Sequence, residues 1–168
     1  SADGNTIVIA VASFWRKSRA IIVYDVSTGE ARRVLESHVS GAADEYLIRI
    51  CDSERVLFGG IVALSGGIDG IALGPDWLYY GALSGSGLYR VRLRDLRDSR
   101  LPPGQLANRV ERYSDKPLSD GMSLDVDGNV YITDIEHSSV FRVNPERELK
   151  TLIQSENVRW ADALSFGP

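Results

Sequence analysis

The chain contains one sequence pattern twice and begins it a third time. The complete copies start at Asp69 and Asp120 and read DGIALGPDWLYYGALSGSGLYRV and DGMSLDVDGNVYITDIEHSSVFRV. The third copy starts at Asp162 and reads DALSFGP. Residues 3–5 (DGN) match residues 127–129 of the second copy, so one repeat is divided between the two ends of the chain. A divided repeat is typical of a closed ring of repeats, and it constrains the architecture more than the chemistry.

The repeat length predicts an all-β fold of the β-propeller type. Successive copies begin 51 and 42 residues apart, and four-stranded propeller blades recur at about 40–50 residues. Short β-branched runs separated by glycine-rich turns favour strands throughout. About three blades therefore fit in one chain. The expected blade-like units are residues 1–37 with a first strand from 162–166, residues 69–115, and residues 120–155.

Two segments interrupt this rhythm. Residues 38–68 are expected to form an inserted hairpin, with strands at 45–50 and 55–61. Residues 95–113 are expected to form a helical insertion. A short helix is predicted there because Leu106, Val110 and Tyr113 follow a Pro-Pro-Gly sequence at helical spacing.

Three blades are fewer than the four to eight or so with which propellers close. One solution is a homodimer with six blades, in which residues 162–166 of one chain pair with residues 6–12 of the other. The other is that this sequence is a piece of a longer gene product that supplies the remaining blades. The sequence leaves both open.

Composition limits the partners. The net charge of −4 gives no electrostatic footprint for nucleic acid. No apolar run approaches the ~20 residues that a membrane-spanning helix needs, so we expect a soluble protein with no membrane partner. No signal peptide is visible in this sequence, and the compartment is left undetermined, with a secreted or periplasmic location among the options.

The propeller topology gathers several polar residues at one end of the channel. First strands lie nearest the axis, and they begin at the same end as the loops between second and third strands. This end is therefore expected to hold the candidate metal ligands Asp69, Asp120 and Asp162. It is also expected to hold the candidate ligand-binding residues Asp134, Glu136, His137, Lys116 and Trp160.

Clustered carboxylates repel one another, and a hard cation such as Ca²⁺, which takes six to eight oxygen ligands, would relieve that repulsion. A calcium site is therefore one interpretation. The alternative is structural, because Asp-Gly is a common turn pair, and this interpretation applies to Asp69 and Asp120. Glu136 and His137 are adjacent and are candidates for an acid–base pair, although an exposed loop histidine without a role is the more common case.

The chain resembles the bacterial relatives of the yellow and major royal jelly proteins. The resemblance rests on DGIALGPDWLYYGALSGSGLYRV, on LANRVERYSDKPLSDGMSLDVDGNVYITDIEHSSV, on VRWADALSFGP and on IIVYDVSTGEARRVLESH. It implies a six-bladed β-propeller shaped like the gluconolactonase group. Family members are usually about twice this long.

The resemblance implies three hypotheses for function. The first is binding of a small molecule or a metal without catalysis, because insect members are associated with pigment chemistry, amine binding or nutrition. The second is a metal-dependent hydrolase of lactones or esters. Asp69 and Asp120 stand at places comparable to two ligands of the gluconolactonase metal, but its Glu ligand has no counterpart here. The third is a structural remnant that only associates.

Overall fold

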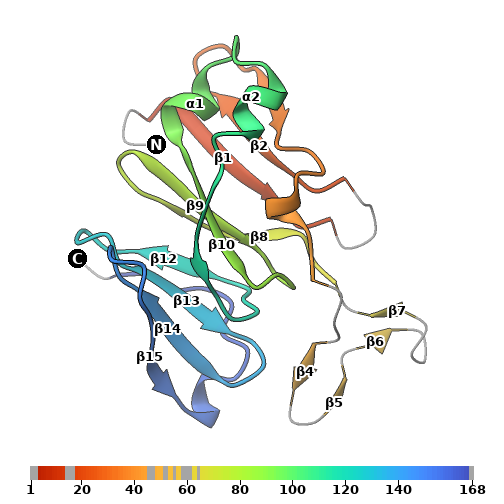
Figure 1. Ribbon diagram of the computed structural model, residues 1–168, viewed down its shortest axis with the longest axis vertical. Coiled ribbons are helices and arrows are strands. Elements are labelled where there is room, and N and C mark those ends of the chain that lie inside the picture. Colours follow the sequence, from red (N-terminus) through yellow and green to blue (C-terminus); the bar gives the residue numbers. More distant parts are fainter. Residues whose placement is uncertain are drawn as a thin grey trace.

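A computed structural model describes residues 4–13, 18–44, 48–50, 53–54, 56–57, 62–63 and 65–166. These residues form three larger antiparallel sheets, two short hairpins and a few short helices (Figure 1). The three sheets follow one another in the order of the chain, each contacting the next. The prediction of an all-β fold is confirmed.

Each sheet is a meander whose strands pair in sequence order. The first sheet contains β1 (Thr6–Val11), β2 (Ala20–Asp25) and β3 (Ala31–Val34). The second contains β8 (Ile68–Leu73), β9 (Trp77–Ala82), β10 (Gly87–Arg92) and β11 (Glu111–Asp115). The third contains β12 (Met122–Leu124), β13 (Val130–Asp134), β14 (Ser139–Val143) and β15 (Leu149–Gln154).

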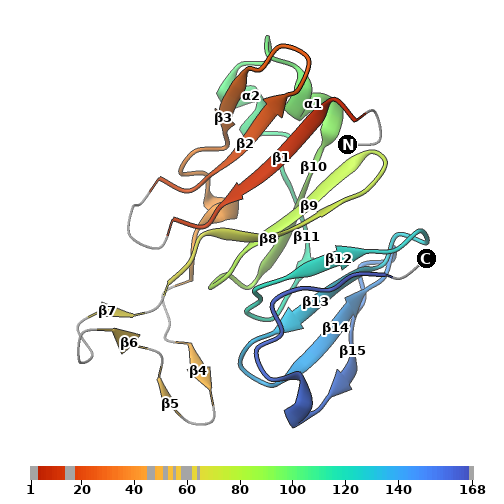
Figure 2. The same cartoon turned by 180° about the vertical axis from the view of Figure 1, so that it is seen from behind.

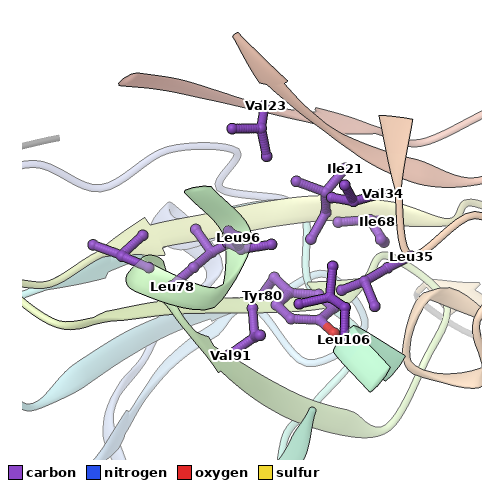
Figure 3. Packing of buried hydrophobic residues seen from close by; sticks show 11 residues of the cluster. Ile21, Val23, Val34, Leu35, Ile68, Leu78, Tyr80, Val91, Leu96 and Leu106 are labelled. Atoms are coloured by element: carbon purple, nitrogen blue, oxygen red, sulfur yellow. The ribbon is translucent and has the colours of Figure 1, made fainter. Parts of the chain in front are cut away.

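The sheets pack face to face because alternate residues of the middle sheet point in opposite directions. Leu78 and Tyr80 of β9 pack with Ile21 of the first sheet in one buried cluster (Figure 3). Tyr79, from the other face of β9, packs with Val130 and residues of the third sheet in a second cluster. The middle sheet is therefore covered on both faces, as an internal blade must be.

The segments between the sheets differ from the expectations in detail. Instead of one inserted hairpin, β4 (Arg49–Ile50) pairs with β5 (Ser53–Glu54), and β6 (Val56–Leu57) pairs with β7 (Val62–Ala63). These two hairpins project from the body of the sheets (Figure 1). Parts of the predicted strands at 45–50 and 55–61 lie outside the described residues. A 3₁₀ turn, η1 (Val39–Gly41), connects the first sheet to this insertion.

The helical insertion is shorter than predicted. It contains α1 (Leu93–Arg97) and α2 (Pro103–Ala107), and Leu106 is buried as expected. Val110 follows the helix, and Tyr113 belongs to β11. The single helix predicted through Tyr113 is therefore wrong. Tyr113 is instead buried from a strand, where its ring meets Tyr79 edge to face with centroids 5.2 Å apart.

The segment after η3 (Glu156–Val158) runs back along β12 without forming a regular strand (Figure 2). Phe166 meets the ring of Tyr131 on β13, with centroids 5.1 Å apart. Residues 162–166 thus lie beside the first strand of the third sheet, as β12 lies beside β8. This is the place that the first strand of a following blade would occupy.

Close approach of the first strands explains why glycine occupies positions 70 and 121. A Cβ atom placed on Gly70 of β8 would lie 2.9 Å from Cε of Met122 on β12. One placed on Gly121 would overlap the carbonyl oxygen of Asp162. Neither glycine has a positive φ, and Asp69 and Gly70 lie within β8 at an irregularity in its pairing with β9. The turn interpretation of Asp69-Gly70 is therefore wrong, because the glycine provides space between strands.

Gly121→Ala should destabilise the fold by about 1–3 kcal/mol, because the new methyl group meets a backbone carbonyl that has to move. Gly104→Ala is the matched control, since no atom lies within 4 Å of that position. Urea denaturation of both variants measures the difference. Equal stability of the two would contradict the close packing of residues 121 and 162.

The first sheet leaves β1 without a strand on its inner edge among the described residues, and Ile7 and Ile9 are 48% and 45% exposed. Residues 162–166 in turn have no described partner beyond β12. We expect these two edges to pair between copies of the chain. The wild-type protein should then have the mass of a dimer by light scattering, and Ile9→Arg should reduce it to a monomer.

Leu152→Arg is the control for that experiment, because Leu152 is 46% exposed on β15, the strand of the third sheet farthest from β12. A monomeric wild-type protein at micromolar concentration, or equal effects of the two variants, would exclude strand exchange as the partner of β1.

Candidate functional site

The candidate site lies where the first strands of successive sheets meet. Asp69 is in β8, Asp120 lies just before β12, and Asp162 precedes the segment that runs along β12. The charges of Asp120 and Asp162 both act on Asp69, which shows that the three carboxylates are neighbours. The structure thus brings together the three residues proposed from sequence as metal ligands.

The pKa of Asp69 is raised to about 6, and burial of the carboxyl is the largest cause. The negative charge of Asp120 adds to the increase, Asp162 adds less, and the positive charge of Lys116 opposes it. Asp69 therefore holds a proton more readily than an isolated aspartate. The end of the channel concentrates negative charge that one lysine only partly balances.

Trp160 borders this group, as the sequence predicted. Its indole Nε1–H donates a hydrogen bond to Oδ2 of Asp120 at 2.6 Å. Trp160 has a left-handed backbone with φ of 47°, a conformation that a bulky residue rarely adopts. Its ring also packs on a small buried cluster containing Ile48 and Ile135. These contacts hold the N–H edge of the indole against Asp120.

Lys116 is the buried cation of the site, with only 4% of its surface exposed. Its Nζ donates to the carbonyl oxygen of Pro117 at 2.9 Å. Its stem packs against Gly81, where no Cβ could be accommodated beside it. Burial lowers the pKa of Lys116 to about 7, against the attraction of Asp44, Asp134 and Asp69.

Not every hydrogen-bond donor of the Lys116 ammonium group has a partner among the described residues. Three carboxylates attract it, yet none of the described ones forms an ion pair with it. A lysine ammonium has three donors, and one donates to Pro117. Within the described part of the chain no further acceptor is found, so two N–H groups of the charged lysine are left for an acceptor. This feature distinguishes the site from a closed structural network.

The loop between β13 and β14 contributes Asp134, Glu136 and His137. Asp134 is 1% exposed, and it accepts hydrogen bonds from the backbone N–H groups of Glu136 at 2.9 Å and His137 at 3.2 Å. Its Oδ2 also accepts from Nδ1 of His137 at 2.9 Å and from Ser139 Oγ at 3.1 Å. Asp134 thus shapes this loop, and its oxygens are already occupied.

Glu136 and His137 have different neighbours. Oε1 of Glu136 accepts a hydrogen bond from the backbone N–H of Arg49 at 2.7 Å, which ties the insertion to this end of the channel. The ring of His137 is held by Asp134, and its side chain is 66% exposed. The carboxylate that orients His137 is therefore that of Asp134.

Asp44 also belongs to this region, which the sequence did not predict. Its Oδ2 accepts a hydrogen bond from the backbone N–H of Ser86 at 2.7 Å, and its charge is the largest attraction acting on Lys116. Asp44 lies in a polar stretch far in sequence from the repeats. No local pattern indicated that it would approach Lys116.

The donor set fits a hard cation in type but not in number. Asp69, Asp120 and Asp162 supply carboxylate oxygens, the ligands that Ca²⁺ prefers. Asp120 already accepts from Trp160. Within the described part of the chain, no three side chains are arranged as a ready metal centre. A bound Ca²⁺ would therefore take most of its six to eight ligands from water or from a bound molecule.

The profile of the major royal jelly protein family matches residues 5–164. The chain belongs to this family. Family members are β-propellers, and the three successive sheets are the propeller blades that the repeat predicted. The resemblance noted in the sequence is thereby confirmed. A search of curated proteins finds no match to this sequence.

Solved structures with a similar chain trace include a calcium-binding protein, regucalcin, from Agrobacterium tumefaciens. It has 16% identity and a TM-score of 0.39, and the alignment covers 89% of this chain and 60% of that protein. A protein of unknown function from Bacteroides thetaiotaomicron has 16% identity and a TM-score of 0.38, with 88% and 40% covered. The chain thus spans 60% or less of either protein.

None of the described helices is long and apolar enough to cross a membrane.

Burial of Lys116 should make stability depend on pH. Its pKa is about 7 in the folded protein and 10.5 when unfolded, so the unfolded chain binds the extra proton between these values. Stability is therefore expected to rise with pH, by roughly 2–3 kcal/mol from about pH 7 to about pH 9.5. Lys116→Met should abolish this rise, as measured by urea denaturation across that range.

Lys150→Met is the matched control, because Lys150 lies on the exposed strand β15. This variant should keep the wild-type slope. A Lys116→Met protein with the same slope as the wild type would show that Lys116 is solvated in the folded state.

Proposed function

We propose that the end of the channel formed by Asp69, Asp120, Asp162, Lys116 and Trp160 binds a small positively charged ligand without catalysing a reaction. The ligand is either Ca²⁺ or the ammonium group of a small organic molecule. One observation carries the proposal: Asp69, Asp120 and Asp162 are neighbours, and Asp69 also interacts with a buried lysine that forms no ion pair with any described carboxylate.

The energetics favour a cation at this place. Neighbouring carboxylates repel one another, and burial strengthens that repulsion. Protonation of Asp69 reduces it only in part above about pH 6. A bound cation would remove the remaining repulsion.

An acceptor atom on the ligand would complete the site. The two N–H groups that Lys116 does not use can donate to a hydroxyl, carbonyl or water oxygen. A ligand with a cationic group and a nearby oxygen therefore fits better than a purely apolar amine. A hydrated Ca²⁺ meets the same requirement through its water molecules.

Hydrolysis of lactones or esters is the alternative function, and one observation favours it. Asp134 holds Nδ1 of His137 at 2.9 Å. If Nδ1 donates in this bond, Nε2 of the neutral ring is left as a base toward solvent, as a general base requires. A metal bound to the carboxylates would supply polarisation of a carbonyl oxygen. His137 would accept the proton of an attacking water molecule.

The test is titration calorimetry with CaCl₂ and, separately, with ethanolamine, with Trp fluorescence as a second readout. Asp120→Asn should weaken binding of the true ligand roughly tenfold or more, because it removes one charge and keeps the side-chain shape. Asp127→Asn is the control, since Asp127 is exposed on a turn outside the site. Binding of only one of the two probes identifies the class of ligand.

Absence of binding by both probes, or equal weakening by Asp120→Asn and Asp127→Asn, would refute the proposal. The alternative would be established instead if the protein hydrolyses a simple sugar lactone and if this activity is lost both on addition of a chelator and in the His137→Gln variant.

A further inference from the structure

A cavity lies away from the candidate site, between the first sheet and the helical insertion. Its volume is about 620 Å³, which is in the range of cavities that hold drug-sized molecules. One wall is the end of β3 and the loop that follows it, and the other is α2 with the residues before it. Its apolar lining includes Val34, Leu35, Leu101, Leu106 and Ala107. Leu35 and Leu106 also belong to the buried cluster of Figure 3.

The polar lining of this cavity carries an unbalanced positive charge. Arg32 is half-buried, and its Nη2 donates to the carbonyl oxygen of Leu96 at 2.6 Å. No carboxylate among the described residues pairs with it. Arg33 also lines the cavity, but Glu36 lies 3.2 Å from its guanidinium and balances it. Arg32 also borders a separate polar pocket with Asp25 and Glu30. Neither carboxylate forms a described ion pair with Arg32, so its remaining donors are available to an anion.

His38 adds a neutral hydrogen-bond donor. Its Nδ1 lies 3.3 Å from the backbone N–H of Ser40 and 2.8 Å from Oγ of Ser40. A backbone N–H can only donate, so Nδ1 accepts and Nε2 carries the proton in the neutral ring. Burial lowers the pKa of His38, which favours this neutral form. Nε2–H is thus the ring donor left for a molecule in the cavity.

The loop that presents these groups is held in an unusual conformation. Leu35 and Ser37 have φ values of 53° and 56°, in the left-handed region that non-glycine residues rarely adopt. The backbone N–H of Ser37 donates to the carbonyl of Arg19 at 2.9 Å, and that of His38 donates to Leu35 at 3.2 Å. Tyr80 supports the same loop, because its hydroxyl lies 2.7 Å from Ser40 Oγ.

We propose that this cavity binds an apolar carboxylic acid, with the carboxylate held by Arg32 and the hydrocarbon body packed against Leu101 and Leu106 in the part of the cavity that His38 also lines. The binding site is separate from the channel and is independent of the function proposed there. An anion matches the uncompensated charge of Arg32. An apolar body matches the remaining walls, and the planar guanidinium suits the two oxygens of a carboxylate.

The experiment compares octanoate with octanamide by titration calorimetry on the full chain. The two probes have the same hydrocarbon tail, and only octanoate has a charge. Octanoate should bind at least about tenfold more tightly, because the charge-assisted hydrogen bonds to Arg32 are lost with the amide. Arg32→Met should remove this preference. Arg94→Met is the matched control, because Arg94 is on α1 with its side chain 79% exposed.

A second measurement does not depend on any variant being folded. NMR of the wild-type protein should show that octanoate shifts the ring signals of His38 and leaves those of exposed His137 unchanged. Equal affinity for octanoate and octanamide, equal effects of Arg32→Met and Arg94→Met, or unchanged signals of His38 on saturation would each overturn the proposal.

Discussion

The arrangement depends on the close approach of the first strands of successive sheets. At Gly121 the neighbouring segment leaves no room for a side chain, and at Gly70 a Cβ atom would require the end of the Met122 side chain to move. The strands can therefore lie side by side near the axis while the sheets pack face to face through their larger residues. The aspartate before each glycine is then brought near its counterpart in the next sheet. The positions of the carboxylates are thus a consequence of how the backbone packs.

This packing creates an electrostatic cost that the surrounding residues only partly offset. Trp160 donates to Asp120, and Lys116 places a positive charge behind the carboxylates. Lys116 is itself buried and makes one described hydrogen bond. Groups that would be more stable in solvent are instead held together at one end of the channel. Such unsatisfied charge in an otherwise well-packed fold is typical of a binding site.

The sequence predicted the architecture because the repeat reports it directly. Copies of one pattern at blade length led to three successive antiparallel sheets, and the family match confirms the propeller. Local interpretation was less reliable. The Asp69-Gly70 pair is typical of a turn by composition. In the structure Gly70 instead lies close to the side chain of Met122, more than 50 residues away in sequence. Tyr113 matched a helical spacing by coincidence, and its pairing with β10 placed it in a strand.

The candidate site could be predicted only where the repeat positions it. Topology placed Asp69, Asp120 and Asp162 at one end, and the structure brings them together. The burial of Lys116 and the approach of Asp44 depend on contacts between segments that no local pattern links. The cavity beside His38 could not be predicted for the same reason. It forms between an irregular loop and a helical insertion, and neither belongs to the repeat.

The pKa of Asp69 tests the account most directly, because it reports the burial of this carboxyl beside its charged neighbours without any substitution or ligand. A pH titration of the side-chain carboxyl signal by carbon NMR would measure it in the ligand-free protein. Burial and the neighbouring charges predict a midpoint of about 6. A midpoint near the ordinary aspartate value of about 4 would show that the first strands do not bring these groups together.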